Sequence, residues 1–366
     1  MKFQIQREDL LIPLQKIIGA VEKRQTMPAL SNILIKADDD KISLTATDLE
    51  IELVTTLNII ADETGETTLP ARKLLDICKA LPDESSISVT VDTNKALVKS
   101  GRSRFSLSTL PADDFPSLDS INAVAEFELP QNTLKELIDK TAFAMALQDV
   151  RYYLNGLLLE VSTGLLRAVA TDGHRLAYCE KQADCELAEM KQVIVPRKGI
   201  QELVRLLNDS EDVLNVILGS NHIRVEVGDI RFTSKLIDGR FPDYNRVIPD
   251  DGKNTIIADR DGLRQALVRA SILSNEKYRG IRLVIDGNVL ELQAQNPDQE
   301  EADVELEVEY KGDALEIGFN VNYMLDVLNV TDAASVQATL RDSSSSCLMT
   351  YPDHPDCKYV IMPMRL

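Results

Sequence analysis

The sequence predicts an α+β protein built from three repeats, each with two helices packed on antiparallel sheets. Its 366 residues are too many for one ordinary core, so two or three domains are expected. Similar segments recur at offsets of 124 and 129 residues, where an alternating strand leads into a helical apolar pattern. They are FQIQREDLLIPLQKIIGAV from Phe3, FELPQNTLKELIDKTAFAM from Phe127 and IIADRDGLRQALVRASILS from Ile256.

Two further families of segments follow the same order in each repeat. A strand, a tight polar corner and a second strand are predicted for the segments that begin at Ile42, Leu165 and Leu290. A strand end followed by a short amphipathic helix is predicted for those that begin at Leu69, Val195 and Phe319. We therefore divide the chain into 1–125, 126–253 and 254–366, each with six to eight strands. Because the strands alternate, one sheet face should meet the helices and the other water or a neighbour.

The composition is that of a soluble globular protein, with 44% apolar residues, 27% charged residues and no Trp. No apolar run approaches the ~20 residues that span a bilayer. The first residues, MKFQIQREDL, show no secretory signal, so we expect a cytosolic protein without a membrane partner. The five cysteines are scattered, so they are expected to be reduced packing thiols. With only three histidines, far apart in the sequence, we predict neither a metal nor a cofactor.

The charge distribution is informative because the net charge of −19 by itself argues against nucleic acid. Basic residues gather in the predicted helices 72–80, 197–207 and 260–279, whereas 296–309 carries seven acids and no base. Solvated faces and snorkelling side chains would explain any one of these segments. Their recurrence instead favours a ring, in which basic inner helices attract phosphate and acidic outer sheets repel it.

A catalytic function finds little support in the motifs. Asp172 and His174 share one polar corner, but they are poorly placed for a triad, and no GxSxG elbow occurs. A phosphate-binding GxxxxGKS loop, an HExxH helix and a dinucleotide fingerprint are also missing from the sequence. A second alternative is a protein scaffold that binds peptides but never DNA. The basic helices disfavour it without excluding it.

Long motifs along the whole chain resemble the bacterial sliding clamp, the beta subunit of DNA polymerase III. The matching segments are PARKLLDIC, SGRSRFSLSTLPADDFP, QDVRYYLNG, ATDGHRL, VPRKG, FTSKLIDGRFPDY, ILSNEKYRG, GFNVNYMLDVLN and VIMPMRL. The resemblance implies three DNA-clamp domains per subunit and a head-to-tail homodimer that forms a six-domain ring around duplex DNA. It also implies a non-catalytic processivity factor. Its partners would be the DNA polymerase III catalytic subunit, a clamp loader and other proteins with clamp-binding motifs.

The resemblance also assigns residues to three surfaces. For DNA contact it points to Arg24, Lys73, Gln148, Tyr152, Tyr153 and Lys198. For a partner-peptide groove it points to Leu154, Thr171, Gly173, His174, Arg175, Leu176, Pro242, Arg246, Val247, Tyr278, Asn320, Tyr323, Val360, Met362, Pro363, Met364 and Arg365. For ring closure it points to Phe105, Leu107, Ile272 and Leu273.

The chemistry of these residues agrees with the implied roles. Apolar and Met side chains make an adaptable pocket for a Leu or Phe anchor, and Arg175, Arg246 and Arg365 would form its rim. Without the resemblance, the paired tyrosines would be half-buried packing and the C-terminal MPMRL a frayed end. Position 278 is Tyr where the family often has Phe, and the run Ser343–Ser346 is assigned no role. From opposite charge alone, Glu300, Glu301 and Glu305 are expected to pair across the joint with Lys99, Arg102 or Arg104.

Overall fold

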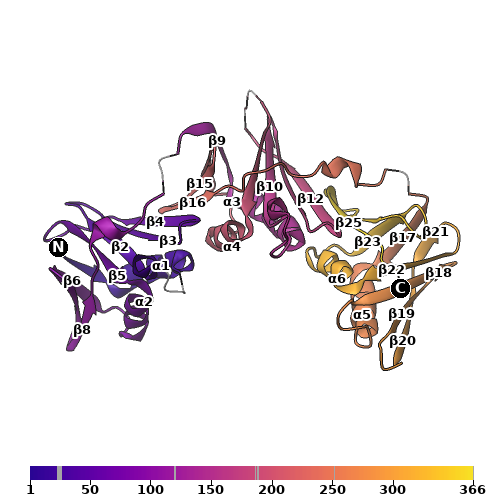
Figure 1. The fold of residues 1–366 in the computed structure, drawn as a ribbon, viewed down its shortest axis with the longest axis horizontal. Helices are drawn as coiled ribbons and strands as arrows, with labels where there is room; N and C mark the ends of the chain where they lie inside the picture. The colour runs from indigo at the N-terminus through magenta and orange to yellow at the C-terminus, as the bar shows by residue number, and fades with distance from the viewer. Residues whose placement is uncertain (23–26, 119–120, 186, 188, 251, 366) are drawn as a thin grey trace. The chain divides into compact units, whose positions relative to one another are not determined.

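The computed structural model describes residues 1–22, 27–118, 121–185, 187, 189–250 and 252–365. Within them the chain forms two compact units, and each is described by itself. Unit 1 comprises Met1–Lys135 and Lys198–Leu236, and unit 2 comprises Glu136–Arg197 and Ile237–Leu366. The α-helices, drawn in Figure 1, are α1 (Arg7–Ile17), α2 (Ala71–Ala80), α3 (Gln131–Thr141), α4 (Arg197–Leu206), α5 (Arg260–Ser271) and α6 (Val321–Asn329).

Unit 1 contains two antiparallel sheets. The four-stranded sheet has the order β1-β6-β7-β8, with strands Lys2–Gln6, Ser86–Asp92, Lys95–Ser100 and Ser103–Ser108. The eight-stranded sheet has the order β5-β2-β3-β4-β16-β15-β14-β9, with strands Gly65–Pro70, Asn32–Ala37, Ile42–Thr47, Ile51–Leu57, Ile230–Lys235, His222–Val227, Val213–Gly219 and Ala123–Pro130.

Helices α1 and α2 pack against each other in unit 1 (Figure 1). In α2 the buried residues are Ala71, Leu74, Leu75 and Cys78, which is the i, i+3, i+4, i+7 spacing of a single apolar face. Of the intervening positions, Arg72, Lys73 and Asp76 are exposed and Ile77 is half-buried. The amphipathic pattern therefore fixes both which side of α2 enters the core and which side carries positive charge.

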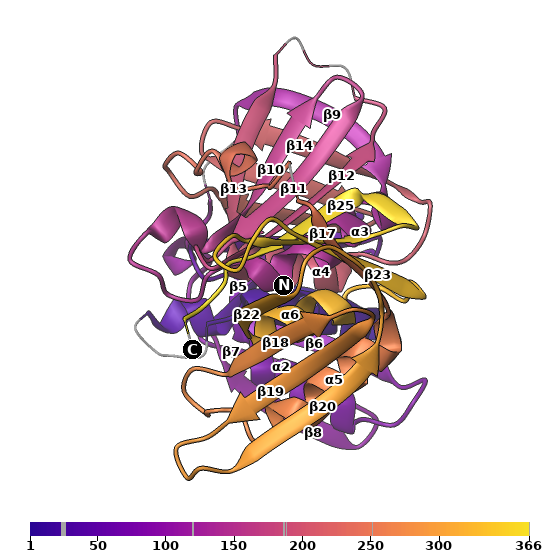
Figure 2. The same ribbon diagram turned by 90° about the vertical axis from the view of Figure 1, so that its right-hand side faces the viewer.

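Unit 2 also contains two antiparallel sheets. The nine-stranded sheet has the order β13-β10-β11-β12-β25-β24-β23-β17-β21, with strands Lys191–Pro196, Gly156–Ser162, Leu165–Thr171, Arg175–Gln182, His354–Ile361, Cys347–Tyr351, Ser335–Leu340, Asn254–Asp259 and Glu309–Lys311. The four-stranded sheet has the order β20-β19-β18-β22, with strands Glu301–Glu307, Val289–Gln295, Gly280–Asp286 and Leu315–Asn320. Figure 2 shows this second sheet in front of α5 and α6.

Helix α5 begins at a side-chain cap, because Asp259 accepts a hydrogen bond of 2.6 Å from the Gly262 N–H. Its buried face packs on β19, β20 and α6. In β20 the acidic side chains alternate outward with Ala302, Val304 and Leu306, which are half-buried. The acidic sheet face predicted from 296–309 is therefore confirmed.

Within the residues that the structure describes, the predicted order of elements is confirmed in all three repeats, with two α-helices in each and alternating strand–helix segments at β1–α1, β9–α3 and β17–α5. The third repeat departs from the expected six to eight strands because β17–β25 are nine, one of them the three-residue β21. Strands of the second repeat contribute to both units, β9 and β14–β16 to unit 1 and β10–β13 to unit 2. The boundaries at residues 125 and 253 stay a prediction.

The expectation of five reduced cysteines is wrong for one pair. Cys179 and Cys357 form a disulfide, while Cys78, Cys185 and Cys347 are free and buried. The pair is 178 positions apart in sequence and is brought together only by the pairing of β12 with β25. Among the described helices none is long and apolar enough to cross a membrane.

Candidate functional site

A pocket of about 170 Å³ opens in unit 2 where β10, β11, β12 and β25 meet two short 3₁₀ turns, Tyr152–Leu154 and Tyr244–Arg246. Nine of its lining residues belong to the predicted peptide groove: Leu154, Thr171, Gly173, Arg175, Leu176, Pro242, Val247, Val360 and Met362. The structure thus brings together residues from four separate stretches of the chain. Most of them are apolar, so the pocket suits an apolar side chain.

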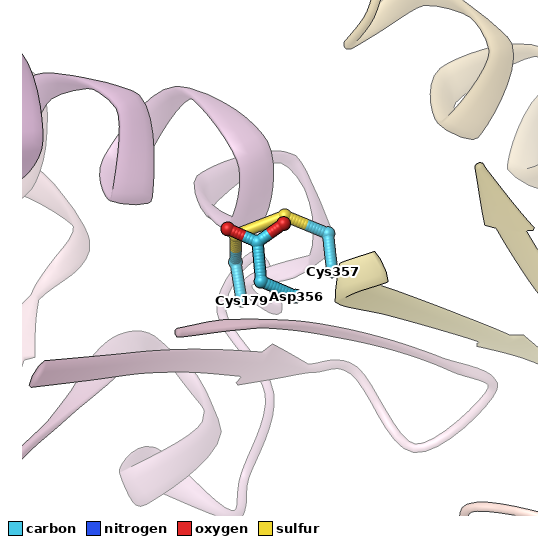
Figure 3. A group of neighbouring side chains, drawn as sticks. All are labelled: Cys179, Asp356 and Cys357. Atoms are coloured by element: carbon cyan, nitrogen blue, oxygen red, sulfur yellow. A yellow bond between two sulfur atoms is a disulfide. The ribbon is translucent and has the colours of Figure 1, made fainter. Parts of the chain in front are cut away.

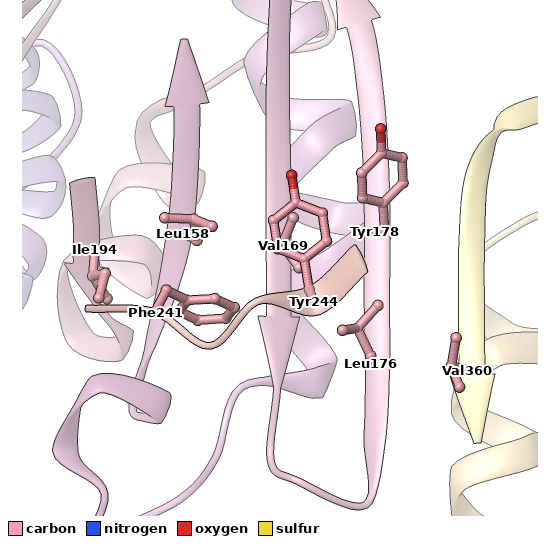
Figure 4. Packing of buried hydrophobic residues seen from close by; sticks show 8 residues of the cluster. All are labelled: Leu158, Val169, Leu176, Tyr178, Ile194, Phe241, Tyr244 and Val360. Carbon is pink, nitrogen blue, oxygen red and sulfur yellow. The ribbon is translucent and has the colours of Figure 1, made fainter. Parts of the chain in front are cut away.

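The floor of the pocket is a packed apolar cluster (Figure 4). Leu158, Val169, Leu176 and Val360 rise from the sheet, and Phe241 and Tyr244 lie over them from the segment that crosses the strands. Each of these side chains is at most 8% exposed. Such a floor is already formed before any ligand arrives, which lowers the cost of binding.

The two tyrosines of this cluster are held by a partly buried polar network. Tyr178 Oη donates to Glu180 Oε2 at 2.5 Å, and Tyr244 Oη donates to Glu160 Oε2 at 3.2 Å. Arg167 joins both carboxylates, at 2.7 Å to Glu160 and 2.8 Å to Glu180. Burial, with the neighbouring Glu160 charge, raises the pKa of Tyr244 to about 12, so its hydroxyl stays a donor at neutral pH.

The corner between β11 and β12 supplies one wall. Asp172 Oδ1 accepts from the backbone N–H groups of His174 and Arg175, at 2.9 and 3.0 Å. Gly173 adopts φ +87°, and a Cβ there would lie 2.8 Å from Arg151 Nη2. Glycine is required at this position both by the backbone conformation and by the guanidinium stacked beside it.

Arg175 lines the pocket, but its guanidinium is committed within unit 2. Nε donates to Asp172 Oδ2 at 3.1 Å, Nη1 pairs with Asp326 of α6, and Nη2 donates to the Phe143 carbonyl at 2.8 Å. The guanidinium carbon also lies 4.5 Å from the ring centroid of Tyr323. Arg175 is therefore a structural part of the wall rather than the free rim charge that we expected.

The C-terminal residues are fixed in place rather than frayed. The Met362 N–H donates to the His174 carbonyl at 2.9 Å, and the Met364 N–H donates to the Gly318 carbonyl at 2.8 Å. The chain thereby continues from β25 to the edge of β22, and Pro363 between them is half-buried.

A second set of predicted groove residues lies along this tail. The His174 ring stacks near Tyr323, with centroids 6.5 Å apart, and Asn320 Nδ2 donates to the Tyr278 carbonyl at 3.3 Å. Tyr278 itself is exposed, as are Arg246 and Arg365. Arg246 pairs with Asp243 at 2.9 Å. None of these side chains lines the pocket among the residues that the structure describes, so they extend the predicted groove beyond it.

Three pocket residues are not among those that we predicted: Arg151, Asp243 and Tyr244. Arg151 pairs with Asp149 at 2.9 Å and donates to the Asp172 carbonyl at 3.3 Å, which ties the 149–151 segment to the corner. All three lie inside the quoted motifs QDVRYYLNG and FTSKLIDGRFPDY. Their neighbours Tyr152 and Pro242 were selected, so the motifs contained a signal for them.

The predicted DNA-contacting residues occur in both units. Arg24 falls outside the described residues. In unit 1, Lys73 is exposed on α2, whereas Lys198 on α4 forms an ion pair with Asp48, whose side chain is 3% exposed. Burial opposes the charge on Lys198, but the hydrogen bond and the attraction of Asp48 prevail and raise its pKa.

In unit 2, Gln148 has φ +57° on an exposed loop, and the Tyr152 and Tyr153 rings meet edge to face at 5.9 Å. Tyr152 is 58% exposed, whereas Tyr153 packs against the floor cluster of the pocket. Packing, the alternative considered for this pair, therefore accounts for Tyr153 but not for Tyr152.

The predicted ring-closure residues lie on one edge strand and just after one helix. Phe105 and Leu107 are on β8, which ends the four-stranded sheet of unit 1. Ile272 follows α5 with its side chain 74% exposed, and Leu273 is half-buried. In the same unit, β20 ends the second four-stranded sheet. A single exposed apolar side chain is common on protein surfaces, so the assignment of Ile272 to ring closure stays a prediction.

Comparison with known proteins gives matches along the whole chain. Family models described as the N-terminal, central and C-terminal domains of the DNA polymerase III beta subunit match residues 1–119, 128–243 and 245–365. The beta sliding clamp of Pseudomonas putida is 55% identical over 367 residues that cover all of both chains. The crystal structure of the DNA polymerase III subunit beta from Pseudomonas aeruginosa is 55% identical, covers both chains fully and superimposes with a TM-score of 0.98. A sliding clamp from the same organism, solved bound to griselimycin, is 54% identical over both full chains with a TM-score of 0.96.

Proposed function

Because the chain belongs to the DNA polymerase III beta subunit family, that of the bacterial beta sliding clamps, we propose that two copies close head to tail into a ring around duplex DNA. Each copy would contribute three domains, 1–125, 126–253 and 254–366, to a six-domain ring. The ring is a non-catalytic processivity factor. It slides in the cytosol without reading bases and keeps the polymerase near its template.

Two open sheet edges of opposite charge carry this proposal. Residues 95–108, which include β8, hold four basic side chains and no acid, and 296–309, which includes β20, holds seven acids and no base. An edge strand offers unpaired N–H and C=O groups to another strand. Because the two edges differ, their contact is heterologous, and such contacts generate a closed ring when the rotation between copies closes. We expect Phe105 and Leu107 to pack near Ile272 and Leu273 of the second copy, with Lys99, Arg102 and Arg104 opposite Glu300, Glu301 and Glu305.

The DNA would run through the ring, whose contacts with the phosphates are weak. These contacts would come from Arg24, Lys73, Gln148, Tyr152, Tyr153 and Lys198. Lys198 can bind a phosphate only by giving up its ion pair with Asp48, so its net contribution to DNA binding is weak. Weak contacts suit the role, since a ring held by its topology needs no strong affinity and strong phosphate contacts would slow its sliding.

Partner proteins would bind through the groove in unit 2. The pocket takes one apolar anchor, and the exposed residues along the C-terminal tail take the rest of an extended peptide. We propose the DNA polymerase III catalytic subunit and the clamp loader as partners, with other proteins that carry a clamp-binding motif. The griselimycin-bound relative supports a ligand-binding surface in this family.

Retention on DNA tests the proposal as a whole. The protein is loaded with a matched clamp loader and ATP onto nicked circular plasmid and onto the same plasmid made linear, and protein that stays on the DNA is measured after gel filtration. A sliding ring stays on the circle and leaves the linear ends. Equal retention on both would indicate ordinary phosphate binding, and no retention on either would favour the peptide-binding scaffold. Each of those two results contradicts the clamp.

A further inference from the structure

The paired strands β12 and β25, here called the seam, join the pocket of unit 2 to the disulfide. Strands β12 and β25 come from the second and third repeats, and their ladder has five pairs, from Arg175 opposite Ile361 to Cys179 opposite Cys357. The second pair, Leu176 opposite Val360, is part of the pocket floor. The cysteines lie three residue steps along the strand from that pair, a span of about 10 Å. Any change at the cysteine end therefore acts on the strands that form the floor.

The disulfide lies at the end of this ladder. The two Cα atoms are 4.1 Å apart, the spacing of a narrow pair in an antiparallel ladder, and both side chains are essentially buried. No pair beyond Cys179 and Cys357 belongs to the described register, and Pro355, two residues before Cys357, has no N–H to continue it. The cysteine end is consequently where the ladder opens first, and opening there loosens the neighbouring pairs toward the pocket.

An ion-pair cluster closes the seam beside the sulfurs. Lys181 Nζ of β12 lies 2.9 Å from Asp356 Oδ2 of β25 and 3.0 Å from Glu136 Oε1 of α3. Figure 3 shows the Asp356 carboxylate directly beside the disulfide. Without the disulfide, the cysteine end depends on noncovalent contacts, among them this partly exposed cluster, the backbone ladder and the Lys358 ammonium over the Tyr178 ring. Partly exposed ion pairs contribute little.

We propose that Cys179 and Cys357 form a reversible thiol–disulfide site that sets how firmly the floor of the peptide groove is held. The oxidised form keeps the seam closed and the groove ready for its peptide, and the reduced form loosens both. The inference rests on the proposed function of the groove.

The exchange needs a protein dithiol as reductant. One thiolate of the dithiol attacks a sulfur of the pair, the Cys179–Cys357 bond breaks, and a mixed disulfide forms while the released cysteine takes up a proton. The second thiol of the reductant then attacks the mixed disulfide, frees the other cysteine and leaves the reductant oxidised. A protein disulfide drives the same steps in reverse.

The test compares two states of the full-length protein. It is prepared oxidised with glutathione disulfide and reduced with tris(2-carboxyethyl)phosphine, and maleimide labelling after unfolding should count three thiols in the first state and five in the second. Hydrogen exchange then reports on the β12 and β25 amides. Fluorescence anisotropy reports binding of a labelled peptide that copies the clamp-binding motif of the same organism's polymerase catalytic subunit.

We expect reduction to speed exchange along the ladder roughly tenfold and to weaken peptide binding about three- to tenfold. The double variant Cys179→Ala with Cys357→Ala should behave like the reduced protein under both conditions. Cys185→Ser is the matched control, since its hydroxyl can keep the bond that Cys185 Sγ donates to the Ser162 carbonyl, and it should respond like the unaltered protein.

The contrary outcomes separate the two proposals. Five thiols after oxidation, or equal exchange and equal peptide affinity in both states, would overturn the thiol–disulfide site while leaving the groove intact. A peptide that binds neither state would overturn the groove, and the inference with it.

Discussion

Replacing Asp326 by Asn tests whether Arg175 holds the pocket wall through α6. The substitution removes a carboxylate that pairs with a guanidinium whose side chain is only 11% exposed. Breaking a fully buried pair costs about 3–5 kcal/mol, and losing an exposed one costs about 0–1 kcal/mol. Asp326 is 42% exposed, and Arg175 retains Asp172 and the Phe143 carbonyl, so we expect an intermediate loss of about 1–2 kcal/mol.

This loss should appear in two measurements. Unfolding followed by circular dichroism should shift to lower temperature by roughly 2–8 °C for a unit of this size. Affinity for the labelled clamp-binding peptide should fall by about 5- to 30-fold, because the loosened wall must be ordered again on binding. The double variant with Arg175→Ala measures the coupling directly, and a coupling energy near 1–2 kcal/mol is expected from the cycle.

Asp353→Asn is the control, since it removes the same charge from an exposed turn of unit 2. Asp326→Glu should restore part of the affinity because it keeps the charge. If Asp326→Asn matched Asp353→Asn in both melting and peptide affinity, Arg175 would not depend on α6 and the reasoning would be refuted.

Three further predictions concern the other surfaces. Asp48→Asn should free Lys198 for phosphate and steepen the slope of log Kd against log salt for a labelled duplex by about 0.9; an unchanged slope would mean that Lys198 does not reach DNA. Arg104→Glu places an acid on the basic edge and should weaken the dimer at least about tenfold by sedimentation, whereas Lys36→Glu on another sheet should not; equal effects would argue against the β8 edge. Deleting Met362–Leu366 should abolish peptide binding and leave the dimer, and full affinity in the truncated protein would contradict the groove assignment.

The element order could be predicted from the sequence because its causes are local. The spacing of apolar residues in 3–21 or 69–81 is set by whether those residues form a strand or a helix. That spacing can be read from the sequence without knowing which other elements pack against the segment. The same locality explains why the count of strands in the third repeat was too low. A strand of three residues such as β21 has too short a pattern to detect.

Long-range pairings could not be predicted in this way. The resemblance assigns Lys198 to DNA contact, and the sequence around it gives no sign of its partner Asp48, which lies 150 positions earlier in another repeat. The resemblance places Arg175 in the groove, where it is expected to form part of the rim, but three acceptors from three parts of the fold take up its guanidinium. The disulfide depends on the register between two strands of different repeats. The sequence near either cysteine contains no pattern that indicates this register.

In a protein of net charge −19, many basic side chains are paired internally, and this pairing keeps the attraction to DNA weak. Arg197 donates to the Met145 carbonyl, Arg260 donates to the carbonyls of Leu328 and Ala333, and Lys198 pairs with Asp48. Several bases of the predicted helices are therefore structural, and the charge left for phosphate is smaller than the sequence count indicates. Since the salt slope grows with each neutralised phosphate, such a surface binds weakly and releases quickly. Weak binding and fast release suit a ring that stays on DNA because it is closed. A protein held on DNA by affinity alone would dissociate.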